Sequence, residues 1–176
     1  MLRCSAVALL ALTACTSLDE GITDDDVAAA AALAEAPAAG VDYDAQIALW
    51  CPGADRAAGV PSYRGLAGTF TRLGLPAPGE PSKLSFAPTR DEPDAAGAFT
   101  GRVGTATGTT RPYAGAFLAL PDNPAIGAVI GLDIGGDGTV DQTSFVLALR
   151  RSPLGTLTGL CLAGRDHPFL LSRTLF

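Results

Sequence analysis

The sequence has little of what most catalytic and nucleic-acid-binding sites are built from. Its 176 residues include one His, one Trp and one Met, and Lys83 is the single lysine among 12 basic residues. The 18 acidic residues leave a formal net charge of −6, which excludes a basic nucleic-acid binder. One His and four Cys exclude a zinc site with several His ligands, and a four-Cys zinc site is not expected.

Long apolar runs are missing as well, and this excludes a polytopic membrane protein. Disorder is not expected either, because 48% of the residues are hydrophobic and only 17% are charged. No set of acid, base and nucleophile can be assembled, since the chain lacks a Gly-x-Ser-x-Gly motif. The one imidazole, His167 between Asp166 and Pro168, is interpreted as a turn residue rather than a general base. We therefore do not expect an enzyme.

Residues 1–14 have the features of an export signal. Arg3 supplies a positive charge, and residues 6–12 are apolar but too few to span a bilayer. The segment leads into Leu12-Thr13-Ala14-Cys15, which resembles the lipobox of bacterial lipoprotein precursors. The resemblance implies cleavage before Cys15 and a lipid on its sulfur. The alternative is an ordinary secretory signal cleaved near Ala14, with Cys15 not lipidated.

The lipoprotein resemblance also implies a location in the bacterial cell envelope. In that family an Asp directly after the lipidated Cys favours the inner membrane, so Thr16 implies the outer membrane if the cell has one. An acidic chain gains no electrostatic attraction to an anionic lipid surface. We therefore expect the acyl chains on Cys15 to hold the protein on the membrane, which is its first expected partner.

Residues 15–45 have the composition of an acidic, Ala-rich tether. Asp26 is placed to cap a short helix over residues 27–36, and the acidic cluster before it suits the positive end of that helix. Alanine is the best helix former, yet ten residues form a marginal helix when isolated. We expect this helix to fray unless it packs on the domain that follows.

Two cysteines remain once Cys4 leaves with the signal and Cys15 carries lipid. Cys51 and Cys161 form an even pair in a chain expected in an oxidising compartment, which favours a disulfide. The alternative is two separately buried thiols, since free Cys behaves as a small hydrophobe. No redox motif surrounds either residue, so the bridge is predicted to be structural.

Residues 46–176 show short apolar or alternating runs separated by Gly, Pro, Asp and Asn, without helical patterns between them. This spacing predicts one all-β domain, a single antiparallel meander of about eight strands that forms a barrel or a sandwich. The predicted strands are Gly68–Leu73, Lys83–Pro88, Gly97–Val103, Pro112–Leu120, Ala125–Ile134, Thr143–Arg151, Thr156–Leu162 and Phe169–Thr174. Eight successive strands from Gly68 to Thr174 resemble a calycin-type barrel, the group that includes lipocalins, and this implies a ligand carrier.

Two of the predicted strands separate large from small side chains. In residues 126–134 the large aliphatics alternate with Gly127, Val129 and Gly131, and in residues 144–150 Phe145, Leu147 and Leu149 alternate with smaller or polar ones. We expect the large face to line the core and the small face to lie near solvent. Alternatively the small face holds a partner, such as the helix over residues 27–36 or an apolar ligand.

The segment Leu132–Asp141 resembles a calcium-binding loop of the D-x-D-x-D-G type. Asp133, Asp137, Gly138 and Asp141 match its first, fifth, sixth and ninth positions, and calcium prefers such hard oxygen ligands. Gly135 stands where the third ligand belongs, and Ser144 where the bidentate Glu belongs. The alternative is a Gly-rich hairpin, in which the glycines meet the positive-φ requirement of the turn.

These observations predict a lipid-anchored envelope protein with a non-catalytic β domain. The domain is expected to bind a small apolar ligand or an envelope protein. The alternative is a calcium-stabilised structural or adhesion module that uses Asp133, Asp137 and Asp141.

Overall fold

The computed structural model describes residues 42–78, 80–89, 95–123 and 125–174. The predicted signal, Cys15 and the predicted helix over residues 27–36 lie outside these ranges. None of the helices in the described part of the chain is long and apolar enough to cross a membrane.

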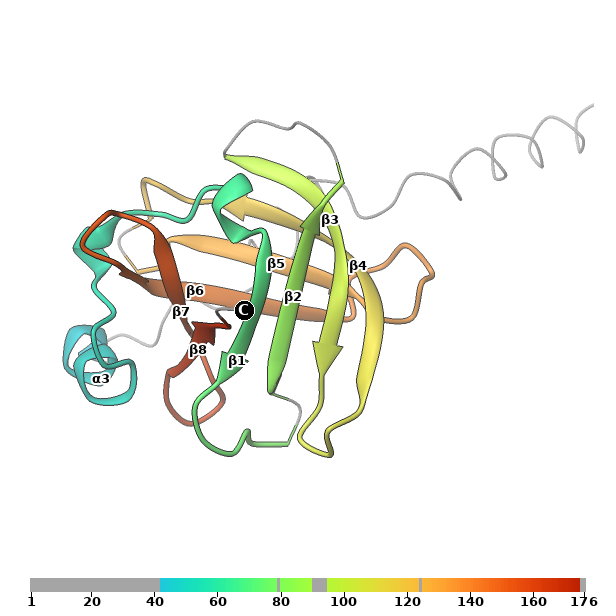
Figure 1. The fold of residues 1–176 in the computed structure, drawn as a ribbon, viewed down its shortest axis with the longest axis horizontal. Coiled ribbons are helices and arrows are strands. Elements are labelled where there is room, and N and C mark those ends of the chain that lie inside the picture. Colours follow the sequence, from blue (N-terminus) through green and yellow to red (C-terminus); the bar gives the residue numbers. More distant parts are fainter. Residues whose placement is uncertain (1–41, 79, 90–94, 124, 175–176) are drawn as a thin grey trace, which may run out of the picture.

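Eight strands form one closed antiparallel barrel (Figure 1). Each strand pairs with the next along the chain, and β1 also pairs with β8. The all-β meander predicted from the turn spacing is therefore confirmed, and it is a barrel. The strands are β1 (Gly68–Arg72), β2 (Lys83–Pro88), β3 (Ala96–Gly104), β4 (Thr110–Ala119), β5 (Ala128–Asp133), β6 (Gln142–Arg151), β7 (Leu157–Leu162) and β8 (Phe169–Arg173).

Pairing between the first and last strands closes the barrel. Phe70 lies opposite Arg173, and Thr71 lies opposite Ser172. Just beyond the ladder, the Thr174 backbone N–H donates to the Thr69 carbonyl at 2.8 Å. Closure leaves no strand edge without a partner, and such an edge would otherwise recruit other chains.

The interior of the barrel is filled by side chains, as expected for eight strands. Phe70, Phe86, Phe99 and Tyr113 form a series of edge-to-face ring contacts with centroids 5.1–5.8 Å apart. The Tyr113 hydroxyl donates to the Ser85 carbonyl at 2.8 Å, and burial raises the pKa of Tyr113. The other large side chains with 2% exposure or less that belong to this cluster are Tyr63, Leu66, Leu84, Phe117, Ile130, Leu132, Leu149, Leu160, Leu162 and Leu171.

Strand β6 does not keep its large side chains on one face, contrary to the expectation from sequence. Phe145 lies opposite Val129, and both belong to a cluster on the outside of the barrel. An irregularity in the pairing with β7, between Val146 and Ala148, then reverses the alternation, so that Leu149 joins the interior. A β-bulge has this effect, because it adds one residue to one strand only.

The outside of the barrel carries a second apolar cluster, called here the outer cluster. Its buried members are Ile47, Cys51, Ala116, Ile126, Val129, Leu147, Ala148, Cys161 and Leu170. Partly buried residues packed against it are Tyr43, Ala54, Leu118, Leu120, Ala125, Val140, Phe145 and Ala163.

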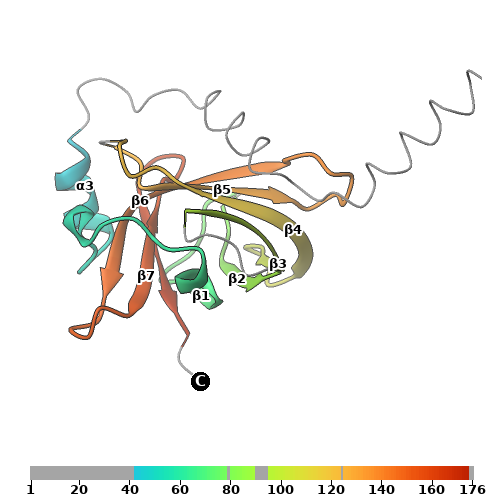
Figure 2. The same ribbon diagram turned by 90° about the horizontal axis from the view of Figure 1, so that it is seen from above.

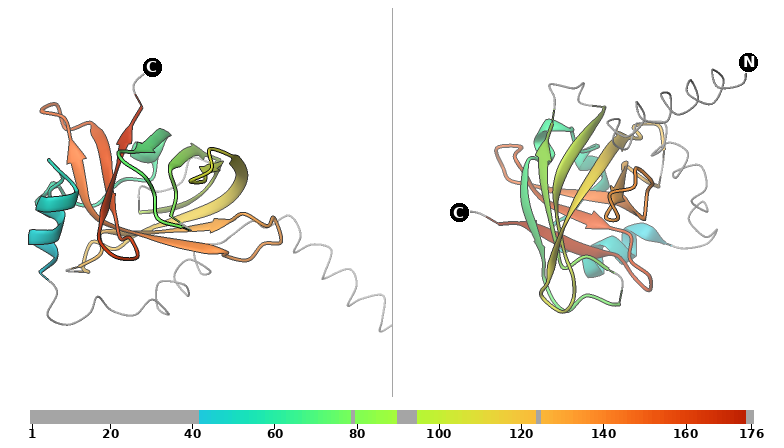
Figure 3. Two further views of the ribbon diagram at one scale, coloured as in Figure 1. Left: turned by 90° about the horizontal axis from the view of Figure 1, so that it is seen from below. Right: turned by 90° about the vertical axis from the view of Figure 1, so that its right-hand side faces the viewer.

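Helix α3 (Tyr43–Trp50) lies against this outer cluster, outside the barrel wall (Figures 2 and 3). The Asp42 carboxylate caps it by accepting from the Ala45 N–H at 3.0 Å, and Ile47 is 3% exposed. The sequence pattern places a tether as far as residue 45, whereas the folded domain begins with this helix. Short 3₁₀ helices, η1 (Arg56–Ala58) and η2 (Arg64–Leu66), follow before β1.

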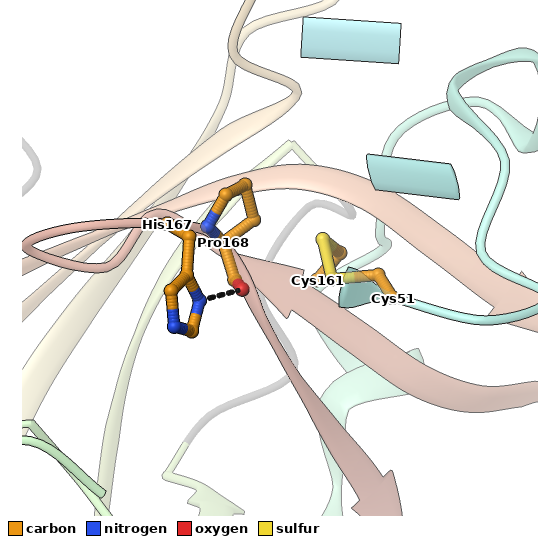
Figure 4. The surroundings of a disulfide bond; sticks show 4 residues. All are labelled: Cys51, Cys161, His167 and Pro168. Atoms are coloured by element: carbon orange, nitrogen blue, oxygen red, sulfur yellow. Dashed lines mark hydrogen bonds between the residues drawn. A yellow bond between two sulfur atoms is a disulfide. The ribbon is translucent and has the colours of Figure 1, made fainter. Parts of the chain in front are cut away.

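A disulfide joins the C-terminal end of α3 to β7. The sulfur atoms of Cys51 and Cys161 are 2.05 Å apart, and both residues are fully buried (Figure 4). The sequence left open a disulfide or two separately buried thiols, and the structure contains the disulfide. It holds α3 on the barrel by a covalent bond as well as by apolar packing.

Removal of the bridge is expected to lower the free energy of unfolding by about 2–5 kcal/mol, because the closed loop is long. The two cysteines are 110 residues apart. The measurement is urea unfolding of the protein with and without reductant, and of the Cys51→Ala/Cys161→Ala variant. Reductant should leave the variant unchanged; equal stability of the oxidised protein and the variant would contradict the prediction.

Candidate functional site

The two ends of the barrel are closed by different means. At the end where β1 begins, Leu66 of η2 is buried, and the Tyr63 hydroxyl donates to the Ala98 carbonyl and accepts from the Thr89 N–H at 3.1 Å. The Arg173 guanidinium donates to the Gly65 carbonyl there. At the other end the hairpin loops surround two hollows, and the candidate site lies at this end.

A buried ion pair separates these two hollows. The Arg72 guanidinium donates to the Glu80 carboxylate and lies 4.2 Å from the centroid of the Phe169 ring. The side chains of Arg72 and Glu80 are 6% and 10% exposed. The Glu80 carboxylate also accepts from the backbone N–H groups of Ala77, at 3.1 Å, and Arg165, at 2.9 Å. It therefore fastens the β1–β2 loop to the β7–β8 loop.

The same contacts set the titration of Glu80. Burial alone raises the pKa of a carboxyl group, but the hydrogen bonds and charge of Arg72, with the two backbone donors, outweigh it. The pKa of Glu80 consequently lies below its ordinary value. The ionised carboxylate is thus the form that the fold stabilises.

The first hollow is called here the apolar hollow and has a volume of about 410 Å³. Pro78 and Pro81 of the β1–β2 loop, Val103, Ala106 and Ile134 provide its apolar lining. This volume falls in the range of small-molecule sites, which are mostly apolar with a few polar groups.

One cation lies at the rim of the apolar hollow. Arg111, near the start of β4, lines the hollow and is exposed, and no ion pair with another described residue is found for it. The acidic residue that also lines the hollow, Glu80, is paired with Arg72. The site thus combines an apolar lining with an available positive charge.

The second hollow, of about 390 Å³, contains the only Trp and the only His of the chain. The Trp50 and His167 rings stack with centroids 3.8 Å apart and planes 7° apart. His167 Nδ1 lies 2.9 Å from the Pro168 carbonyl oxygen, which only accepts, so Nδ1 carries a proton (Figure 4). His167 is therefore a hydrogen-bonded turn residue stacked on Trp50. The exposed Leu73 and Leu75 also line this hollow.

The Asp-rich loop is organised by its own backbone. The buried Asp133 carboxylate accepts from the N–H groups of Gly136 at 2.5 Å, Asp137 at 3.3 Å and Gly138 at 2.9 Å. The exposed Asp141 carboxylate accepts from Ile134 and Gly135 at 2.7 and 2.6 Å. These bonds stabilise a β5–β6 turn in which Gly136 and Gly138 have φ values of 75° and 83°.

Calcium binding by this loop stays a prediction. The Asp137 carboxylate accepts from the hydroxyl and the N–H of Thr139, and these bonds lower the pKa of Asp137. Within the described ranges, no group of three His, Cys, Asp or Glu side chains could hold a metal ion. The three carboxylates nevertheless surround Gly135, because a side chain there would meet Asp133, Asp137 and Asp141 within 4 Å.

The structure thus defines a closed eight-stranded antiparallel barrel with a filled interior and hollows at one end. Comparison with family models, curated proteins and solved structures finds no match. The calycin resemblance therefore stays a prediction, and the function must be inferred from the site alone.

The sequence predicts the disulfide and the Asp-rich turn but not the two hollows or the Arg72–Glu80 pair. Neither hollow is lined by the small-residue face of β5, because Val129 and its neighbours on that face point to the outside of the barrel. The residues of the apolar hollow come from three different hairpins, and no short sequence pattern connects them. The one available signal is Pro78 and Pro81, whose spacing marks a stiff loop.

Replacement of Asp133 by Ala is expected to lower the free energy of unfolding by about 1–3 kcal/mol, because three backbone donors lose their acceptor. Asp137→Ala should change it by less than about 0.5 kcal/mol, since that side chain is exposed. The measurement is thermal unfolding of both variants with calcium and with chelator. A Tm that rises with calcium in the wild type but not in Asp137→Ala would instead support the calcium site.

Glu80 is expected to make the stability of the fold depend on acid pH. Because the pKa of Glu80 is lower in the folded than in the unfolded chain, its stabilisation is complete above about pH 5 and is lost as the pH falls through the folded-state value. Glu80→Gln should cost about 3 kcal/mol at pH 7, since Arg72 stays buried without its partner. The variant should also flatten the pH dependence between about pH 5 and 3.

Urea unfolding across this pH range provides the measurement. Asp122→Asn, at an exposed position in the β4–β5 turn, is the matched control and should keep the wild-type pH profile. A Glu80→Gln profile as steep as that of the wild type would contradict the role given to this carboxylate.

Proposed function

We propose that this protein is an exported, lipid-anchored module of the bacterial envelope that binds a small apolar ligand with an anionic group. The apolar hollow is the observation that carries the proposal. It combines a volume of about 410 Å³, an apolar lining and the exposed Arg111. Export and the lipid on Cys15 are supported by the sequence of residues 1–15.

The ligand is proposed to lie at the mouth of the barrel rather than inside it. Phe70, Phe99, Ile130 and Leu160 are each no more than 2% exposed and occupy the interior with the other core residues. Interiors packed in this way resist added volume, because a further group forces side chains out of their preferred rotamers. The buried Val103 instead forms part of the lining of the hollow.

Arg111 is proposed to select the polar end of the ligand. A guanidinium offers a fork of donors that suits a carboxylate or a phosphate. The Thr105 and Thr107 residues of the β3–β4 hairpin line the same hollow and offer no competing negative charge. An apolar chain with one acidic head, such as a long-chain carboxylic acid, satisfies both parts of the site.

Catalysis forms no part of the proposal. The hollow contains Glu80, but this carboxylate accepts three hydrogen bonds and is held ionised by Arg72. A group bound so fully is a poor proton donor near neutral pH. His167 lies in the other hollow, where its ring stacks on Trp50.

The proposal predicts that Arg111→Gln weakens binding of a fluorescent long-chain carboxylic acid about two- to fivefold, the range for an exposed ion pair. Binding of its methyl ester should stay unchanged. Ala106→Trp should weaken both ligands more strongly, because the new ring occupies the apolar hollow. Fluorescence titration of the full chain at two salt concentrations provides the measurement.

Arg102→Gln is the matched control, because Arg102 is exposed on β3 and donates to Thr110 rather than lining the hollow. It should bind both probes like the wild type. Equal affinity of wild type, Arg111→Gln and Ala106→Trp for both probes would overturn the proposed site. Native mass spectrometry of the protein from bacterial cells would reveal a ligand retained during purification.

A calcium-stabilised structural module is the second candidate. It is favoured by one observation, the position of three carboxylates around Gly135. The calcium arm of the Asp133 and Asp137 experiment tests it. This candidate requires no ligand in the apolar hollow.

A further inference from the structure

The outer cluster extends beyond the area that the described helices contact. Helix α3 packs against β8 and η1 packs against β6. The cluster continues over β4 and β5 through Leu118 and Val129, and Phe145 of β6 lies beside them. Val129 and Ala116 in this part of the cluster are 0% exposed, and a segment packed over Leu118 and Phe145 would account for their burial.

The chain enters the domain at this same cluster. Tyr43, the second described residue, already packs against it, and Asp42 caps the helix that begins there. The preceding chain therefore starts beside the outer cluster. Residues 37–41 span at most about 18 Å when extended. Helix α3 packs against β8, and β6 and β5 lie two and three strands away, about 10 and 14 Å, so residue 36 can reach both.

The segment before this connection has the composition of a helix that needs a partner. Residues 27–36 read Val-Ala-Ala-Ala-Ala-Ala-Leu-Ala-Glu-Ala, with Glu35 as the single charge. In a helix, Leu33 and Glu35 would point about 200° apart, so that Leu33 faces a surface while Glu35 faces water. A helix of ten residues is marginal alone and gains its stability from packing.

The β4–β5 part of the outer cluster suits such a helix. Ala116 lies directly opposite Gly131, and both are buried. Gly and Ala at these positions leave space for another backbone to come close. Larger apolar side chains, Leu118 and Phe145, lie on either side of Val129 in the same cluster.

We propose that residues 27–36 of this chain dock as a helix on the outer cluster over β4, β5 and β6. The side that carries Ala29, Leu33 and Ala36 contacts Val129 and Phe145. The docked helix extends the cover that α3 begins. The inference is independent of the ligand and of the lipid anchor.

The test places one Trp at the margin of the proposed contact. The test protein is the full chain with Trp50→Phe and Phe145→Trp, so that its one Trp is at position 145. Cys4→Ser and Cys15→Ser leave Cys51 and Cys161 as the two cysteines that can oxidise. Acrylamide quenching of its fluorescence is then compared with and without Leu33→Glu. Docking predicts at least a twofold increase in the quenching constant with Leu33→Glu.

Ala31→Glu is the matched control, since it introduces the same side chain about 200° away from Leu33 on the helix. It should leave the quenching constant unchanged. Equal quenching in all three proteins overturns the proposal. Protection that increases with protein concentration assigns the surface to a second copy and also overturns it. If Phe145→Trp fails to fold, Leu118→Trp provides the same readout.

Discussion

Closure between β1 and β8 is the constraint on which the rest of the structure depends. These strands lie at opposite ends of the barrel sequence, so their pairing requires all six intervening strands to be in register. With the ring closed, every strand has two neighbours and no edge remains. Eight strands enclose a space that side chains fill, which leaves the ends and the outer surface for binding.

At each end of that filled interior, one arginine lies over an aromatic ring of the core. Arg72 lies 4.2 Å from the Phe169 centroid at one end, and Arg173 lies 5.0 Å from the Phe70 centroid at the other. Their surroundings differ, because Arg72 has Glu80 as an ionic partner while Arg173 donates to the Gly65 carbonyl. Burial lowers the pKa of Arg173. Each guanidinium thus places a positive charge over an aromatic ring of the core near one end of the barrel.

The strands could be predicted because their signals are local. Alternation and turn residues define β2 without error and most other strands to within one or two residues, and two cysteines in an exported chain indicate the bridge. What the sequence did not predict depends on distant partners. Helix α3 is stabilised by a disulfide and by contacts on the outer cluster, and the inward turn of Leu149 follows an irregular pairing with β7. Arg72 and Glu80 meet only because a loop folds back.

The hydrogen bond from Thr174 to Thr69 has a consequence for how the chain can be rearranged. It places the end of β8 beside the start of β1 as if a hairpin loop between them had been omitted. The barrel is therefore a ring of eight strands with seven connections. The order of neighbouring strands around this ring would be the same whichever strand came first in the chain. A short turn from residue 174 to residue 68 would complete the ring. New termini could then be opened in another hairpin, with α3 and its bridge becoming the real obstacle to circular permutation.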